Sequence, residues 1–121
     1  YAYKTLLNYV AFLILGTDYP VDDINPLRTF YTAVFRKEMN GKPANGYHAE
    51  EGLFREEALK GMTIWAAIGS FDENKKGTLE PGKLADVVIL SGDILKIAEE
   101  KIPSVYVLHT IINGKPVYSY E

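Results

Sequence analysis

The sequence is short of the residues that most often bind metals. It has no cysteine and only two histidines, His48 and His109, among its 121 residues. The absence of cysteine excludes disulfide bonds and thiolate metal sites. Zinc is usually held by at least three protein ligands, so two histidines alone do not complete such a site.

Long apolar runs and basic runs are also missing. The apolar run Val10–Leu15 is far shorter than the roughly 20 residues of a membrane-spanning helix. No basic segment precedes this run, so we expect no targeting signal. Lysine and arginine are scattered, and the net charge of -3 does not favour a nucleic-acid surface. We therefore expect a cytoplasmic protein with neither a membrane nor a nucleic-acid partner.

The composition is that of a folded chain, because 47% of its residues are hydrophobic. The length fits one ordinary domain. Tyr3, Leu6 and Leu7 have helical spacing, so residues 3–9 resemble the end of a helix. This beginning predicts a chain cut from something longer, the alternatives being a shortened form or a disordered start.

The first half of the chain predicts one strand and two helices. Residues 10–16 are apolar throughout, as in a strand covered on both faces of a parallel sheet. Asn25-Pro26 fits the cap and first position of a helix that we expect over 26–38. A second helix is predicted from about 55 to 68, where the small residue Gly61 would permit close approach of a neighbouring element.

The second half predicts extended structure. Residues 87–90 read as a buried strand, and residues 94–102 as irregular or a short helix. A further strand is expected over 104–112. Asn113-Gly114 then follows, the strongest short hairpin signal, because both residues tolerate positive φ. A return strand begins at Val117, so we expect an α/β chain that ends in part of a small antiparallel sheet.

Asp18 stands where the predicted strand 10–16 ends and before Pro20 turns the chain. In parallel α/β sheets and barrels, the carboxyl ends of strands carry catalytic groups. A carboxylate there is a candidate for proton transfer or metal binding. The alternative is an ordinary turn, since Asp and Pro are both common in turns.

Two motifs resemble the metal-dependent amidohydrolase superfamily, and most closely its amidohydrolase family 3, which includes N-substituted formamide deformylases. The first is residues 15–21, Leu-Gly-Thr-Asp-Tyr-Pro-Val, similar to the family's Gly-(Ser/Thr)-Asp-x-Pro. The second includes residues 77–90, Gly-Thr-Leu-Glu-Pro-Gly-Lys-Leu-Ala-Asp-Val-Val-Ile-Leu, and ends with Asn113-Gly114. The likeness covers nearly the whole chain, and its Glu-Pro-Gly-Lys-x-Ala-Asp part is the more specific.

The resemblance implies an α/β fragment made of two parts. Residues 1–69 would be the C-terminal end of a TIM-like barrel, with 10–16 as its last strand followed by two helices. Residues 70–121 would be the C-terminal share of a composite β-sandwich that both chain ends build in this family.

The resemblance also implies a mechanism for a longer parent protein. A divalent metal, most often zinc, would activate water to attack the carbonyl of a small-molecule amide. Asp18 would match the family aspartate that accepts the proton of this water, returns it to the leaving nitrogen, and sometimes touches the metal. Thr17, Tyr19, Pro20 and Asp22 would then lie beside the substrate.

The sequence departs from the family where metal ligands are concerned, because it has no His-x-His pair. We therefore expect a fragment that binds no metal tightly and is inactive alone. The alternative is a non-catalytic binding or assembly module with the same fold. His48 reads as a surface loop residue and His109 as a structural residue of a strand. Asp22 and Asp23 either line a substrate pocket or, as we favour, assist the start of the following helix.

Removal of the other barrel strands would leave strand 10–16 and apolar helix faces uncovered. Exposed strand edges and apolar patches tend to be covered by self-association. We therefore expect a homo-oligomer, formed by strand exchange or by a related contact.

Overall fold

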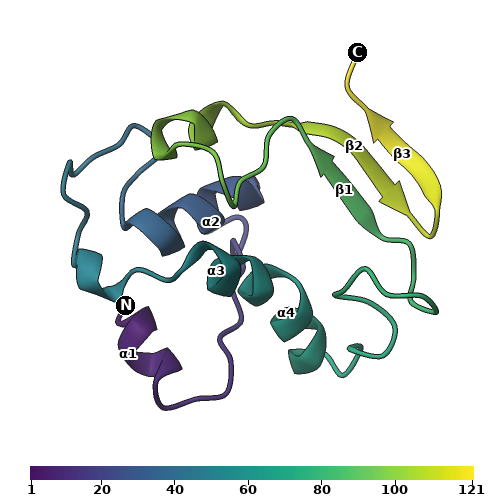
Figure 1. Cartoon of the computed structure of the whole chain (residues 1–121), viewed down its shortest axis with the longest axis horizontal. Helices are drawn as coiled ribbons and strands as arrows, with labels where there is room; N and C mark the ends of the chain where they lie inside the picture. The colour runs from purple at the N-terminus through teal and green to yellow at the C-terminus, as the bar shows by residue number, and fades with distance from the viewer.

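The computed structural model describes all residues from Tyr1 to Glu121, as a helical half followed by a small sheet (Figure 1). None of the helices is both long and apolar enough to cross a membrane. The elements in chain order are α1 (Tyr3–Leu7), α2 (Pro26–Phe35), the 3₁₀ helix η1 (Ala49–Glu51), α3 (Arg55–Met62), α4 (Ile64–Gly69), β1 (Val87–Leu90), the 3₁₀ helix η2 (Glu99–Ser104), β2 (Val107–Ile112) and β3 (Lys115–Ser119).

Helix α2 begins as the sequence predicts. The Asn25 side chain accepts a hydrogen bond from the Leu27 N–H at 3.0 Å, and Pro26 occupies the first helical position. The helix ends earlier than the predicted residue 38, because Arg36 adopts a left-handed conformation with φ 57°. The Arg36 carbonyl then accepts a hydrogen bond from the Tyr47 N–H at 2.8 Å, so the chain leaves the helix toward the following loop.

The single helix predicted over 55–68 is divided in two at Thr63. Thr63 has φ −126° and ψ −97°, which no helix accommodates. Its hydroxyl donates to the Leu59 carbonyl at 2.7 Å, a side-chain hydrogen bond of the kind that competes with the backbone ladder. The sequence therefore predicts the helical conformation of this region correctly, but it misses the break between α3 and α4.

Phe54 precedes α3, and its side chain has no atom that can cap the helix. Instead the Glu57 carboxylate accepts from the Phe54 N–H at 2.7 Å, which is half of a capping box. The Lys4 ammonium donates to the same carboxylate at 2.7 and 2.8 Å and lies 3.9 Å from the centre of the Phe54 ring. These contacts attach α1 to the start of α3.

The strand predicted over 10–16 is not formed in this chain, and that prediction is wrong for the structure described. A strand needs a hydrogen-bonded neighbour, and no other strand lies beside this segment. The segment instead packs on α3. The Leu15 N–H donates to the Gly61 carbonyl at 3.1 Å, and Leu13 and Leu15 border the hydrophobic core.

Three strands form an antiparallel sheet in the order β1-β2-β3, as the second half of the sequence predicts. The predicted strand 104–112 is shorter, because η2 occupies the chain up to Ser104. Strand β1 is not buried as expected. Val88 and Ile89 remain 53% and 42% exposed, because the rest of the chain covers the faces of this small sheet only in part.

The predicted hairpin turn at Asn113-Gly114 is present, with φ 49° and 75°. Both values are positive, as a type I′ turn requires. The Asp86 carboxylate accepts from the Asn113 N–H at 2.8 Å, and the Ala85 carbonyl accepts from the Gly114 N–H at 3.0 Å. Ala85 and Asp86, which end the Glu-Pro-Gly-Lys-x-Ala-Asp motif, thus connect the hairpin turn to the start of β1.

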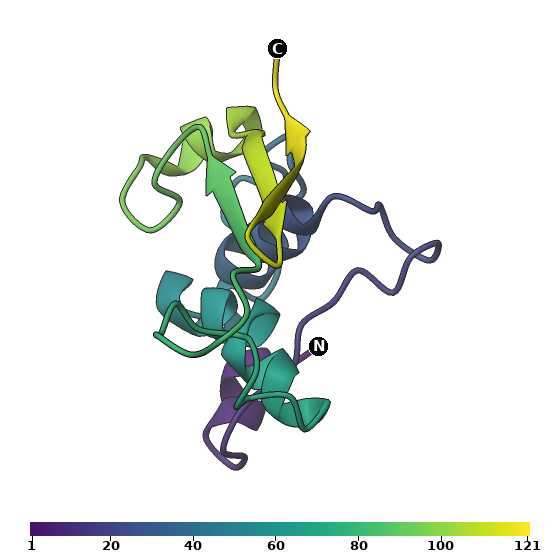
Figure 2. The same cartoon turned by 90° about the vertical axis from the view of Figure 1, so that its right-hand side faces the viewer.

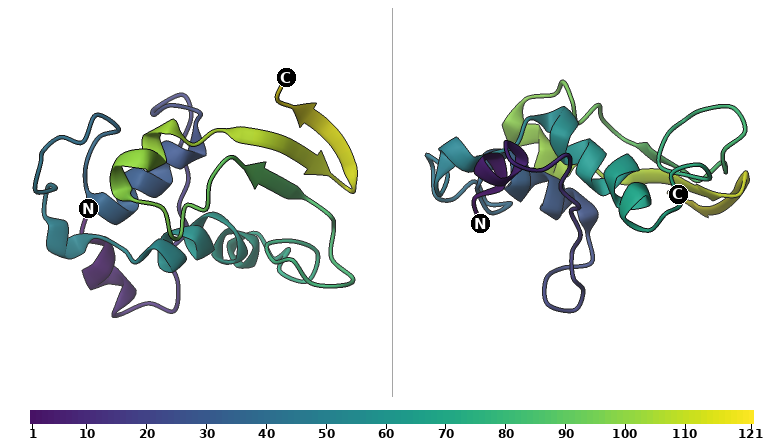
Figure 3. Two further views of the ribbon diagram at one scale, coloured as in Figure 1. Left: turned by 45° about the horizontal axis from the view of Figure 1, so that its top comes forward. Right: turned by 90° about the horizontal axis from the view of Figure 1, so that it is seen from below.

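The hydrophobic core lies where α2, α3 and the segment around η2 meet (Figure 3). Phe30, Tyr31 and Ile102 are its largest fully buried side chains. Only 11 of the 121 residues are buried, so this core covers a small share of the chain. The sheet extends beyond it, and exposed apolar side chains lie both on the sheet and in the segment 9–24.

Candidate functional site

The loop between α1 and α2 carries the residues that the first motif singles out. It projects from the body of the molecule (Figure 2). Asp18 has φ 50°, in the left-handed region that Asp tolerates better than most residues. The Tyr19–Pro20 peptide bond is cis, and the Val21 N–H donates to the Asp18 carbonyl at 2.8 Å. These features make residues 18–21 a type VI turn.

The Asp18 carboxylate is exposed on this turn. Its oxygens accept no hydrogen bond and join no ion pair. The carboxylate is thus free to bind a proton, a water molecule or a cation that another group presents. The chain holds the backbone of this residue in a defined turn while leaving its acid group unengaged.

Tyr19 and Pro20 are exposed as well, whereas Thr17 is half-buried. The Tyr19 N–H donates to the Thr17 hydroxyl at 3.3 Å, and the Tyr19 side chain is 63% exposed. Pro20 has the cis peptide bond with Tyr19 at its N-terminal side. No contact in the structure brings these residues together with a second functional group, so their predicted place beside a substrate stays a prediction.

Asp22 and Asp23 contact residues at the start of α2, and their expected assistance to this helix stays a prediction. Asp22 lies 3.4 Å from the Arg28 guanidinium, and the Asp23 carboxylate accepts from the Asn25 N–H at 2.9 Å. Arg28 also lies 4.0 Å from Asp23. Both carboxylates are therefore held by the helix start.

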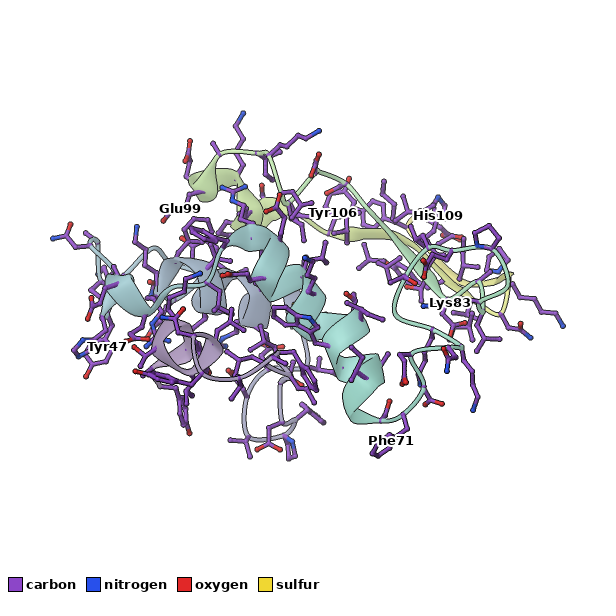
Figure 4. All side chains as sticks on the ribbon, turned by 60° about the horizontal axis from the view of Figure 1, so that its bottom comes forward. Tyr47, Phe71, Lys83, Glu99, Tyr106 and His109 are labelled. Atoms are coloured by element: carbon purple, nitrogen blue, oxygen red, sulfur yellow. The ribbon has the colours of Figure 1, made fainter.

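The two histidines do not meet each other. His48 is exposed, with Nδ1 2.9 Å from the Glu50 carboxylate, and its ring packs edge-on against Tyr47 at 4.6 Å. The nearby histidine lowers the pKa of Glu50 through this hydrogen bond. His109 pairs across the sheet, with Nδ1 3.1 Å from the Ser119 hydroxyl. Figure 4 shows Tyr47 and His109 at opposite ends of the molecule.

A metal site is not assembled from the residues of this chain. No group of three or more His, Cys, Asp or Glu side chains lies close enough to hold a metal ion. Asp18 would supply one ligand, where zinc usually takes at least three from protein. The residues present therefore do not fit a complete metal centre.

A feature that sequence reasoning missed is a groove between β1 and the helices α3 and α4, which we call the β1 groove. Its volume is about 940 Å³. Its lining is mainly apolar and includes Leu59, Met62, Ala66, Val87 and Leu90. The small side chains in α4 were visible in the sequence, but their distance from β1 depends on the loop of residues 70–86 that joins them.

Comparisons with known proteins give one consistent result. The model of the amidohydrolase family matches residues 1–118. The chain is 41% identical over 118 residues to Protein LONG AFTER FAR-RED 3 of Arabidopsis thaliana, covering 98% of this chain and 20% of that protein. It is 31% identical to the putative amidohydrolase YtcJ of Bacillus subtilis, covering 98% and 22%.

A third relative is the N-substituted formamide deformylase of Arthrobacter pascens, at 30% identity with 98% of this chain and 21% of the relative covered. The chain thus spans about a fifth of the length of the curated relatives it matches. No solved structure matches it.

Proposed function

Because the chain belongs to the amidohydrolase family, we propose that it is the C-terminal part of a longer metal-dependent hydrolase of non-peptide C–N bonds. The observation that carries this proposal is the match over residues 1–118, which includes the Gly-Thr-Asp-Tyr-Pro motif around Asp18. The relatives named as an amidohydrolase and a formamide deformylase support small amides as the substrate class.

In this proposal residues 1–69 complete the end of a TIM-like barrel, and 70–121 give the C-terminal share of a β-sandwich. Segment 10–16 becomes a strand only beside the barrel strand that precedes it. Its apolar sequence and its lack of a strand partner here are consistent with that role. Strand β1 and the hairpin formed by β2 and β3 would supply the sandwich strands.

Asp18 is the residue that this chain contributes to the chemistry. An ionised carboxylate at the end of the strand accepts a proton from the attacking water and returns it to the leaving nitrogen. Its exposed and unengaged oxygens suit this role, because a proton carrier must reach both water and substrate. Thr17, Tyr19 and Pro20 are its neighbours in the chain and would lie beside the substrate, and Asp22 would do so only by exchanging its contact with Arg28 for one with the substrate.

The metal of the parent, which we propose to be zinc, would polarise the amide and lower the pKa of the attacking water. Its ligands lie in the part of the parent that this chain does not include, with Asp18 as an additional contact. The chain alone is then inactive, because a lone exposed carboxylate does not hold the metal.

The test is amide hydrolysis by the long polypeptide that contains this chain. N-substituted formamides are the first substrates to try, with Asp18→Asn as the variant and Asp23→Asn as its matched control. Loss of the proton carrier should lower kcat by about 10²–10⁴-fold. The control should leave kcat within a small factor, because Asp23 is occupied at the start of α2.

Equal kcat values for the Asp18→Asn variant and the unchanged enzyme would remove Asp18 from the mechanism. A long polypeptide that folds and binds zinc yet hydrolyses no amide would favour the alternative, a binding or assembly module with the amidohydrolase fold.

A further inference from the structure

Asparagine followed by glycine occurs at three places in this chain, Asn40-Gly41, Asn45-Gly46 and Asn113-Gly114. Asparagine is one of the chemically labile residues of proteins. Its side-chain amide can be attacked by the backbone nitrogen of the next residue, and a glycine there has no side chain to hinder the attack. The hydrogen bonds of the folded chain decide which of the three pairs can react.

Asn40 is held in its turn by its own side chain. Its Nδ2 donates to the Glu38 carboxylate at 3.1 Å, and its Oδ1 accepts from the Lys42 N–H at 2.9 Å. The Gly41 N–H donates to the Glu38 carbonyl at 2.8 Å, which closes the turn of residues 38–41. Three hydrogen bonds must therefore open before the Asn40 amide can meet the Gly41 nitrogen.

The pair Asn113-Gly114 is held by the sheet. The Asn113 N–H donates to the Asp86 carboxylate at 2.8 Å, and the Gly114 N–H donates to the Ala85 carbonyl at 3.0 Å. The strands on either side of this turn, β2 and β3, also pair with each other. Reaction here requires the hairpin turn to separate from the start of β1, which is a larger opening than that of one local turn.

Asn45 has the same place in its turn as Asn40 but lacks these restraints. The turn lies in the loop that follows α2 (Figure 1), and the Gly46 N–H closes it by donating to the Pro43 carbonyl at 2.9 Å. Asn45 is exposed, and its side chain makes no hydrogen bond. Opening of this one local hydrogen bond frees the Gly46 nitrogen for the Asn45 amide.

We propose that Asn45 is a self-modification site of this chain, at which the side-chain amide is lost as ammonia. The Gly46 nitrogen gives up its proton and forms a bond to Asn45 Cγ, the Cγ–Nδ2 bond breaks, and Nδ2 leaves as ammonia with that proton. Water then opens the resulting succinimide ring at either of its carbonyls. One opening gives aspartate, and the other gives isoaspartate, in which the side-chain carbon has entered the main chain.

Isoaspartate at position 45 would disturb the attachment of this loop to α2. The Tyr47 N–H donates to the Arg36 carbonyl at 2.8 Å, and Arg36 Nε donates to the Tyr47 carbonyl at 3.1 Å. Gly46 lies between these bonds and the modified residue, and a Cβ added to it would meet the Phe35 carbonyl oxygen at 2.7 Å. Because the backbone is packed this closely, the extra main-chain atom should weaken the Tyr47–Arg36 hydrogen bonds.

The inference does not depend on the proposed hydrolase function, and it is tested on the 121-residue chain itself. The folded chain is kept at mildly alkaline pH, where the backbone nitrogen loses its proton more readily, and tandem mass spectrometry of its peptides follows the change from amide to acid at each asparagine. Each further hydrogen bond that must open lowers the population of the reactive conformation about fivefold. Asn40, with two more such bonds than Asn45, should therefore react about 25-fold more slowly, and Asn113 at least about fivefold more slowly.

Two controls separate the effect of the fold from that of the sequence. In urea that unfolds the chain, the three pairs should react at similar rates, because these hydrogen bonds are absent. Asn45→Gln would need a larger ring and should remove the early product without affecting the fold, since the Asn45 side chain holds nothing. Faster reaction at Asn40 or Asn113 than at Asn45 in the folded chain would overturn the proposal, and so would an early product that persists in Asn45→Gln.

Amide hydrogen exchange tests the effect on the loop. After equal storage, the Tyr47 N–H should exchange faster in the unchanged chain than in Asn45→Gln, because only the unchanged chain has formed isoaspartate. Equal protection of the Tyr47 N–H in the two chains, with the product present at Asn45, would refute the predicted weakening of the Tyr47–Arg36 contact.

Discussion

Gly61 provides the sharpest test of how the amidohydrolase motif region is held together. It lies in α3 against the segment that leads to Asp18, and the Leu15 N–H donates to its carbonyl at 3.1 Å. A Cβ atom at this position would lie 2.8 Å from Leu15 Cγ and 3.1 Å from the Leu13 carbonyl oxygen. Gly61→Ala therefore adds a methyl group where none fits without movement of the backbone.

Two effects of Gly61→Ala oppose each other. Alanine favours the interior of a helix over glycine by about 1 kcal/mol. Overpacking a filled contact costs about 1–3 kcal/mol, and the hydrogen bond from Leu15 contributes about 1 kcal/mol more if it is broken. The packing terms are larger, so the variant should be less stable by about 1–2 kcal/mol, with a melting temperature lower by about 4 °C per kcal/mol.

Urea denaturation followed by the fluorescence of Trp65, the single tryptophan, measures this difference. Gly69→Ala is the matched control, because its added Cβ would meet only the flexible end of the Ile14 side chain, which is 54% exposed. That side chain can turn aside, so Gly69→Ala should be neutral or slightly stabilising. A Gly61→Ala chain as stable as the unchanged one would show that segment 13–15 does not pack on α3.

Three further predictions concern local contacts. Asn25→Ala removes the cap of α2 and should lower the free energy of unfolding by about 1 kcal/mol, measured by urea denaturation. Asp86→Ala leaves the Asn113 N–H without its acceptor and should cost about 1–3 kcal/mol, whereas Asp86→Asn keeps an acceptor oxygen and should cost less, with the same assay. The hydrogen bonds from Thr5 lower the pKa of Glu51 below its ordinary value of 4.5. This contribution to stability is present above pH 4.5 and is lost as the pH falls through the pKa that Glu51 has in the folded chain. The melting temperature should therefore decrease in this acidic range. Glu51→Gln, which cannot titrate, should make that decrease smaller.

The parts of the fold that could be predicted from the sequence depend on local chemistry. Asn25-Pro26 specifies a helix start through one side-chain acceptor and one fixed φ, and the structure forms it. Asn113-Gly114 specifies a hairpin because both residues accept positive φ, and the turn is present. In each case the determining atoms lie within a few residues of one another.

The parts that could not be predicted depend on distant partners. Segment 10–16 has the composition of a buried strand, but a strand forms only where another strand offers hydrogen bonds, and this chain offers α3 instead. The exposure of the β1 side chains has the same origin, since the apolar sequence of a strand does not show whether another part of the protein packs against it. The break at Thr63 depends on one side-chain hydrogen bond that any helical threonine could form.

The position of Asp18 follows from both kinds of determinant. Its turn is local, because the Asp18 carbonyl accepts from the Val21 N–H three residues later. The attachment of its loop to the body depends on a residue far away in the sequence, because Leu15, three residues before Asp18, contacts Gly61 of α3. The absence of a side chain at Gly61 thus fixes where the loop leaves the core, while the turn fixes how the carboxylate is presented. A motif scan identifies the acid, but the glycine in α3 that anchors its loop becomes evident only from the packing of the two segments.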